Sequence, residues 1–230
     1  MNPAEESLGI SNGRGRLLVF GRQRFAPSQG LTFDGDGMGN LVSWHTVTTL
    51  WMAWLIYWAI SSQNVRHAHT VEPLPWRIST PVIMALAAML VFSPFFRVGP
   101  LARRFVPENR WIAGIGIILV IAGLAISVWA RRHLGQFWSS RVTLKVDHQL
   151  IQSGPYARVR HPIYSGLLLA LIGTALFVGE WRAVAGVALV FAAHWNKARR
   201  EEALLTREFG ATYDQYRGRT GALVPRLFGG

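Results

Sequence analysis

The stretch Tyr164–Trp195, YSGLLLALIGTALFVGEWRAVAGVALVFAAHW, decides the architecture of this chain. It contains two apolar runs, Tyr164–Val178 and Trp181–Trp195, and only Gly179 and Glu180 separate them. So short an interruption between long apolar runs indicates that the chain reverses its direction there. We therefore predict a tight hairpin of two helices. Each is shorter than the roughly 20 residues that cross a hydrocarbon core, so we expect a tilted or partly sheltered pair.

Three longer apolar runs precede the hairpin. None of them contains Asp, Glu, Lys or Arg, and they cover Leu41–Ile60, Ile78–Phe96 and Trp111–Ala130. Each is close to the roughly 20 residues of a membrane-spanning helix. With the hairpin, they predict an all-α integral membrane protein with about five transmembrane helices. The span count stays open, because five spans would place the 97–110 loop and its four arginines outside the cell.

The composition supports a membrane protein rather than a nucleic-acid-binding one. Half of the 230 residues are hydrophobic and 16% are charged, whereas soluble proteins have about 25% charged residues. A net charge of +12 with ten Trp and five Tyr suits basic loops at anionic headgroups and an interfacial aromatic belt. Membrane lipids are therefore expected partners. The absence of cysteine excludes a disulfide framework and a thiolate metal site, and no metal site is predicted.

Composition also divides the chain into three regions. Residues 1–40 are polar and rich in glycine, and we interpret them as a flexible arm. Residues 41–130 hold the three long runs, and residues 131–230 hold the hairpin with polar segments on either side. The alternating segment RVTLKV, residues 141–146, predicts a short strand or an extended segment.

The second hairpin helix is predicted to continue beyond its apolar run into water. Apolar residues recur at roughly helical spacing as far as Phe209, and Gly210 is typical of the position after a helix C-terminus. A short helix is predicted from about Ala211 to Arg217. In the third run, small residues at Gly114, Gly116 and Gly123 predict close helix packing, and the alternative is a position near a ligand.

The hairpin places its two polar flanks on one side of the membrane. Segment 131–160 carries six Lys or Arg residues and the tail after the hairpin carries seven. Positive charge favours the cytoplasmic side. We therefore predict a site that faces the cytoplasm, in the cell inner membrane.

Chemically versatile side chains gather at the open end of the hairpin. Tyr156, His161 and Tyr164 precede it, and Glu201 and Glu202 follow it. A carboxylate accepts hydrogen bonds from an ammonium group, while the histidine, the tyrosines and a helix N-terminus donate to a carboxylate. Together they suit a zwitterion such as the amino-acid end of a cofactor. The alternative is structural: a solvated helix face and an interfacial anchor.

Two segments on either side of the hairpin resemble a known family. LIQSGPYARVRHPIYSG, residues 150–166, and EEALLTREFGATYDQYRGRT, residues 201–220, look like the isoprenylcysteine carboxyl methyltransferase family. They also resemble the wider group of integral-membrane methyltransferases that includes the phospholipid N-methyltransferases. The resemblance covers about Leu134 to Arg226. It implies an all-helical membrane fold in which a cytoplasmic C-terminal helical cap covers S-adenosylmethionine, whose methyl group passes to a lipid-like acceptor.

The resemblance also implies site residues. The implied cofactor-binding residues are His148, Gln149, Leu150, Ile151, Tyr156, His161, Pro162, Ile163, Tyr164, Glu201 and Glu202. In the eukaryotic members, an Arg four residues before the cofactor-binding Glu is implicated at the acceptor carboxylate. Lys197 stands at that position here, which keeps the charge but loses the bidentate fork. No catalytic residue is assigned, because a carboxylate acceptor needs no base, whereas an amine or hydroxyl does.

The predicted function is S-adenosylmethionine-dependent carboxyl O-methylation of a lipid-like or prenylated acceptor. Three alternatives remain. The first is N-methylation of a phospholipid or other small lipid. The second is an NADPH-dependent membrane reductase, since sterol reductases share a related C-terminal architecture. The third is a non-catalytic membrane scaffold whose basic loops bind lipids or partners.

Overall fold

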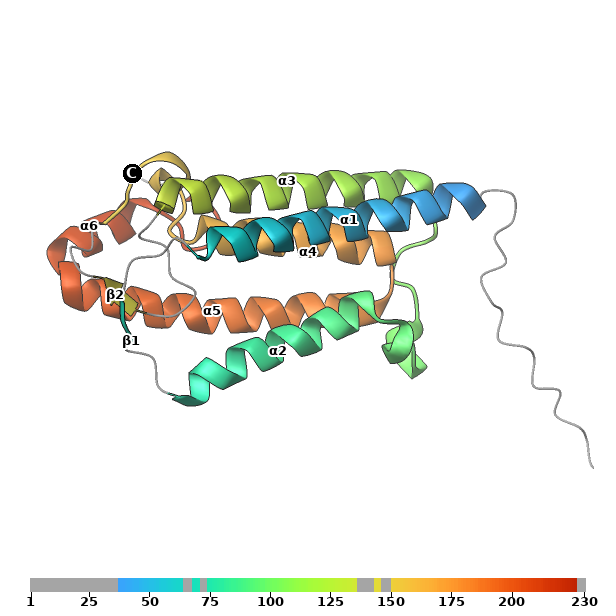
Figure 1. Ribbon diagram of the computed structural model, residues 1–230, viewed down its shortest axis with the longest axis horizontal. Coiled ribbons are helices and arrows are strands. Elements are labelled where there is room, and N and C mark those ends of the chain that lie inside the picture. The colour runs from blue at the N-terminus through green and yellow to red at the C-terminus, as the bar shows by residue number, and fades with distance from the viewer. Residues whose placement is uncertain (1–36, 64–67, 71–73, 136–142, 146–149, 227–230) are drawn as a thin grey trace, which may run out of the picture. The chain divides into compact units, whose positions relative to one another are not determined.

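The computed structural model describes residues 37–63, 68–70, 74–135, 143–145 and 150–226. Most of them lie in six α-helices (Figure 1): α1 Gly37–Ser61, α2 Leu74–Phe92, α3 Arg110–Leu134, α4 Pro162–Val178, α5 Trp181–Phe209 and α6 Ala211–Arg219. Short 3-10 helices cover Pro94–Phe96, Gly99–Ala102 and Gly154–Ala157. The predicted helical fold is confirmed in its main features.

The fold is mostly rather than entirely helical. Strands β1 Ala68–Thr70 and β2 Thr143–Lys145 pair in antiparallel register, with Ala68 opposite Lys145. This pair confirms the short strand predicted for residues 141–146. It corrects the all-α description, because the period-2 alternation of that segment favours extended backbone.

The predicted hairpin is present. α4 ends at Val178, and Gly179 adopts the left-handed conformation with φ of 73°, where its N–H donates to the Ala175 carbonyl at 2.8 Å. Glycine adopts this conformation without the steric cost that a Cβ brings. α5 then begins at Trp181. Gly210, with φ of 50°, separates α5 from α6 as predicted.

Several helix boundaries differ from the sequence prediction, among them the start of α1 and the end of α2. α1 begins at Gly37, within the segment assigned to the arm, and residues 1–36 lie outside the described residues. α2 ends at Phe92 rather than Phe96. The prediction for α2 was wrong because Pro94 has no N–H to continue the helix. A 3-10 turn begins there instead, and the Ser93 hydroxyl caps it.

Glycines bring α3 and α4 into backbone contact. A Cβ added to Gly123 of α3 would lie 2.4 Å from the Gly166 carbonyl oxygen and 2.4 Å from the Ala170 nitrogen of α4. A Cβ added to Gly116 would lie 2.7 Å from the Gly173 carbonyl. The packing role predicted for Gly116 and Gly123 is therefore supported. Gly114 differs, because nothing lies within 4 Å of its added Cβ.

Tryptophan side chains attach α1 to this pair. The Trp51 indole donates to the Thr174 hydroxyl of α4 at 3.0 Å, and the Trp54 indole donates to the Ser127 hydroxyl of α3 at 2.8 Å. Both hydroxyls are fully buried. Trp58 packs against the cluster around Tyr156. Large side chains with polar tips thus hold α1 against α3 and α4.

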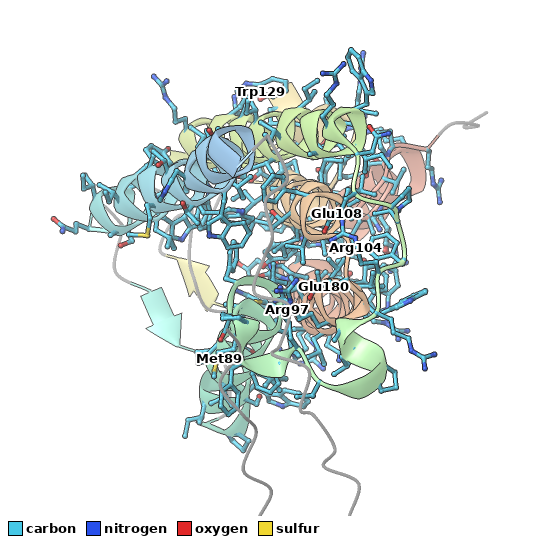
Figure 2. The ribbon with its side chains drawn as sticks, turned by 90° about the vertical axis from the view of Figure 1, so that its right-hand side faces the viewer. Met89, Arg97, Arg104, Glu108, Trp129 and Glu180 are labelled. Carbon is cyan, nitrogen blue, oxygen red and sulfur yellow. The ribbon has the colours of Figure 1, made fainter. Side chains whose placement is uncertain are left out.

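A buried ionic cluster joins α2 and α5 at the hairpin turn. Glu180 is 1% exposed, and it accepts from Arg182 at 2.5 Å and from Arg97 at 2.7 Å. Figure 2 looks onto this end of the molecule and shows Arg97 beside Glu180. Arg182 also donates to the carbonyls of Leu90, at 2.8 Å, and Val91, at 3.0 Å. These carbonyls lie in the last turn of α2, which has no intrahelical partners for them.

By length and apolar composition, α3 is the one helix among the described residues that is able to cross a membrane. α4 and the segment Ile78–Phe92 of α2 are apolar but shorter. The helices alone do not establish five spans, and that number remains a prediction.

Candidate functional site

The hairpin brings His161 to the acidic pair of α5. His161 precedes the first turn of α4, whose Pro162 occupies the first helical position, where a missing N–H costs nothing. Its Nε2 lies 3.0 Å from Oε1 of Glu202, and its Nδ1 lies 3.5 Å from Oε2 of Glu201. The side chain is only 7% exposed. The two polar clusters therefore meet as the sequence analysis expected.

Tyr164 forms the second side of the site. Its hydroxyl donates to Oε1 of Glu201 at 2.7 Å. Its ring stacks on the His161 ring, with 5.4 Å between centroids and an interplanar angle of 4°. The Lys197 ammonium lies 5.7 Å from the same ring centroid. Lys197 thus contacts the site from one turn before Glu201, and the cation approaches the ring within the range of a cation–π interaction.

His194 is a site neighbour that the sequence analysis missed. Its ring meets the Tyr164 ring edge-on, with 4.6 Å between centroids. Its Nδ1 lies 2.9 Å from the carbonyl oxygen of Val190. A carbonyl only accepts, so Nδ1 carries a proton. The available signal was spacing: His194 lies two helical turns before Glu201, on the same face of α5.

Arg160 is a second residue to which no role was assigned. Its Nε donates to Oε1 of Glu202 at 2.8 Å, and its Nη1 donates to the Thr220 carbonyl at 2.5 Å. The guanidinium therefore connects α5 to the segment after α6. The sequence carries no signal for this link, because its acceptor on the C-terminal side is a backbone carbonyl.

The contacts within the site favour the charged forms of its acidic and basic groups. Burial acts to raise the pKa of Glu202, but hydrogen bonds from His161 and Arg160 outweigh it and lower that pKa to about 2. The pKa of Glu201 is also below its usual range, because His161, Lys197 and Tyr164 outweigh burial. The two carboxylates raise the pKa of His161 against the effect of its burial. Each of these shifts favours the charged form of its group: a carboxylate at Glu201 and Glu202, and an imidazolium at His161.

Glu202 gives the protein a defined acid sensitivity. Its pKa is lowered from 4.5 to about 2 in the folded state, so its contribution to stability is present above the unfolded value and is lost as the pH falls through the folded value. We expect the unfolding temperature to drop over this pH interval. Glu202→Gln should flatten the drop, as measured by tryptophan fluorescence in detergent. Glu108→Gln, at a carboxylate that is 77% exposed, is the control. An unchanged slope in Glu202→Gln would contradict the assignment.

An apolar wall adjoins the ionised cluster. Tyr156, Ala130 and Ile163 form its buried centre, and Ile151 packs against it together with Tyr164. The Tyr156 ring is 7% exposed, and burial raises the pKa of its hydroxyl. This wall and the residues packed against it include four of the predicted cofactor residues: Ile151, Tyr156, Ile163 and Tyr164.

Two of the other predicted residues are described by the structure, and two are not. Pro162 is buried at the start of α4, and Leu150 is half-buried. His148 and Gln149 lie outside the described residues.

The residues of the site fit S-adenosylmethionine. That cofactor combines two positive groups, an ammonium and a sulfonium, with a flat adenine ring. Among the described residues, Glu201 accepts one close hydrogen bond, from Tyr164, whereas His161 is at 3.5 Å, beyond a good hydrogen-bond distance. A carboxylate accepts about four hydrogen bonds. Glu201 therefore retains acceptor capacity for a cation, and the apolar wall offers a surface for a flat ring.

These features define a class: helical proteins with an acidic, partly apolar site at the open end of a helical hairpin. Residues 116–207 match the model of the isoprenylcysteine carboxyl methyltransferase (ICMT) family. The resemblance inferred from the sequence is confirmed by this match. The matched segment contains α4, the His161 loop and the acidic pair of α5.

Individual proteins also match this chain over part of its length. Protein-S-isoprenylcysteine O-methyltransferase of Schizosaccharomyces pombe is 35% identical over 96 residues, which are 40% of this chain and 41% of that protein. The nickel-cobalt-cadmium resistance protein NccN of Alcaligenes xylosoxydans xylosoxydans is 28% identical over 122 residues, which are 52% of this chain and 54% of that protein.

A solved structure of the eukaryotic intramembrane Ras methyltransferase ICMT aligns over 69% of this chain and 55% of that one, with 24% identity and a TM-score of 0.45. That likeness is too weak to argue from. The chain spans 41% of the length of the S. pombe relative and 54% of that of NccN.

Proposed function

We propose that this protein is a membrane-embedded methyltransferase that uses S-adenosylmethionine to methylate a carboxylate on a lipid-like or prenylated acceptor. The observation that carries the proposal is the cluster of His161, Tyr164, Glu201 and Glu202 at the mouth of the hairpin. All four lie inside the family-matching segment. Ionisable groups beside membrane helices are functional by default, because they are costly to keep there.

The chain's own residues would bind and orient the reactants. Glu201 would hold the cationic end of the cofactor, with Tyr164 fixing the carboxylate. The apolar wall around Tyr156 would hold the flat ring and exclude water. The bound cofactor supplies a methyl group on a good leaving group, so alignment is the main requirement. Lys197 would attract the acceptor carboxylate, which is itself the nucleophile and has no proton to remove.

Methylation of an amine or a hydroxyl is the second candidate, and His194 is the observation that favours it. Since Nδ1 of His194 carries its proton toward the Val190 carbonyl, the neutral ring offers Nε2 as an acceptor. A protic acceptor needs such a base. The printed names of the relatives are also not uniform. Some are named as isoprenylcysteine O-methyltransferases, and two are named as metal resistance proteins.

Exposed apolar side chains support the membrane location. Met52, Leu55 and Ile56 of α1 and Ile118 and Ile121 of α3 are all about half exposed or more. Proteins that stay in water rarely expose such large contiguous apolar surface. We place this surface in lipid, with about five spans, and α6 as a cytoplasmic cap at the inner membrane. Within this arrangement, residues 1–40 form the arm, 41–130 the first three spans and 131–230 the methyltransferase region.

The test uses purified protein in detergent, methyl-labelled S-adenosylmethionine and two acceptors, an S-farnesylcysteine derivative and phosphatidylethanolamine. A methyl ester releases its label as methanol in base, whereas an N-methyl group does not. We expect base-labile product from the farnesylcysteine derivative. Lys197→Met should raise the KM for that acceptor more than it lowers kcat, and Arg199→Met, at an exposed position on α5, should not. Label in phosphatidylethanolamine would favour the second candidate, and no label from folded protein would overturn both.

A further inference from the structure

The segment after α5 is tied to the His161 loop by backbone hydrogen bonds. We refer to residues 211–224 as the C-terminal strap. The Arg160 N–H donates to the Gly221 carbonyl at 2.9 Å, and the His161 N–H donates to the Ala222 carbonyl at 3.0 Å. Both loop residues are therefore held by the strap through their main chain.

Side chains complete this attachment. The Ser165 hydroxyl donates to the Leu223 carbonyl at 2.6 Å. The Tyr216 hydroxyl donates to the Tyr156 carbonyl at 2.7 Å. Tyr213 and Tyr216 of α6 are both almost fully buried. The C-terminal strap is therefore hydrogen-bonded to residues from Tyr156 to Ser165.

The Arg160 side chain links the C-terminal strap to α5. Its Nη1 donates to the Thr220 carbonyl at 2.5 Å and to the Arg217 carbonyl at 3.3 Å, while its Nε donates to Glu202 at 2.8 Å. A guanidinium has several donors in a fixed geometry, so it is able to join a carboxylate and two carbonyls at once.

The two glutamates differ in how they are used. One oxygen of Glu202 receives both Arg160 and His161, at 2.8 and 3.0 Å. Glu201 receives Tyr164 at 2.7 Å and faces His161 only at 3.5 Å. Glu202 thus receives two close donors on one oxygen, whereas the close donor to Glu201 among the described residues is the neutral Tyr164 hydroxyl, with His161 farther away. The Glu202 contact also fixes the His161 ring, on which Tyr164 stacks.

We infer that the adjacent glutamates divide two tasks: Glu202 is the counter-ion through which Arg160 and the C-terminal strap position His161, and Glu201 alone receives the cationic part of the ligand. Arg160 is therefore a positioning residue, acting through Glu202. The inference rests on the proposed function and deepens it, because it assigns one carboxylate of the pair to the ligand and the other to the scaffold.

The test measures S-adenosylmethionine binding by calorimetry and thermal unfolding for the same set of variants. Glu201→Gln should weaken binding by roughly 10- to 100-fold, the range for one hydrogen-bonded charge, and should lower the unfolding temperature less than Glu202→Gln does. Glu202→Gln and Arg160→Gln should each lower the unfolding temperature and weaken binding. The double variant should be no worse in either quantity than the worse single variant, because both substitutions break the same link. Arg160→Lys should recover part of the affinity.

Arg158→Gln is the matched control, because that exposed side chain lies in the same loop. Effects of Arg160→Gln and Glu202→Gln that multiply in affinity would overturn the coupling. A second outcome would overturn the scaffold role of Glu202: a Glu202→Gln variant whose affinity for S-adenosylmethionine falls as much as that of Glu201→Gln, but whose unfolding temperature equals that of the wild type. If the wild type binds no S-adenosylmethionine, the ligand role of Glu201 falls with the proposed function. The unfolding temperatures of the single and double variants then still decide whether Arg160 acts through Glu202.

Discussion

Replacement of Gly123 by leucine is expected to prevent α3 and α4 from packing, and with it the folding of the protein. Even a Cβ at this position would lie 2.4 Å from two backbone atoms of α4, a distance at which one helix must move. Backbone atoms of a packed helix do not rotate away as side chains do. The expected cost exceeds the roughly 1–3 kcal/mol of ordinary overpacking. The measurement is the yield and thermal unfolding of protein purified in detergent.

Gly114→Ala is the matched control on the same helix. Nothing lies within 4 Å of the added Cβ there, and alanine favours a helix by about 1 kcal/mol over glycine. We expect this variant to fold with unchanged or higher stability. A Gly123→Leu variant that purifies and melts like the wild type would show that α3 and α4 do not approach as described.

Removal of the Glu180 carboxylate, at the hairpin turn between α4 and α5, is expected to lower the free energy of unfolding. The expected loss is about 3–5 kcal/mol, the usual cost of breaking a buried ion pair. Glu180→Ala would leave Arg182, which is 5% exposed, without its carboxylate. It would also free Arg97, the second partner of Glu180. Since Arg182 holds the last carbonyls of α2, the loss should detach α2 from α5. Thermal unfolding in detergent measures the effect.

Glu108→Ala provides the comparison at the same end of the molecule, where Figure 2 labels both glutamates. Glu108 pairs with Arg104 at 3.0 Å, but its side chain is 77% exposed. Exposed pairs contribute about 0–1 kcal/mol. Equal unfolding temperatures for the Glu180 and Glu108 variants would refute the structural role of the buried cluster.

The hairpin and the meeting of its polar ends were predictable from the sequence, because both follow from run length and one turn. Once Gly179 reverses the chain, the residues before α4 and late in α5 must come together. Tyr164, His161 and Glu201 were therefore recognisable as neighbours without coordinates. The family resemblance rested on the same two segments.

The strap and the buried ionic cluster were not predictable in the same way. The strap binds the His161 loop through the carbonyls of Gly221 and Ala222, and backbone groups leave no pattern in the side chains. Arg97 and Glu180 are 83 positions apart, so no helical spacing connects them. Arg182 bonds to backbone carbonyls of α2, which likewise leave no pattern in the side chains.

Calorimetric titration of the detergent-purified protein with S-adenosylmethionine, with NADPH as the control ligand, tests the central claim most directly. We expect micromolar binding of S-adenosylmethionine and no binding of NADPH. Glu201 and Tyr164 suit a cationic ligand, whereas the carboxylate of Glu201 would repel the phosphates of NADPH. Binding of NADPH alone would make the protein a reductase. Binding of neither ligand to folded protein would contradict the methyltransferase account and favour a non-catalytic membrane scaffold.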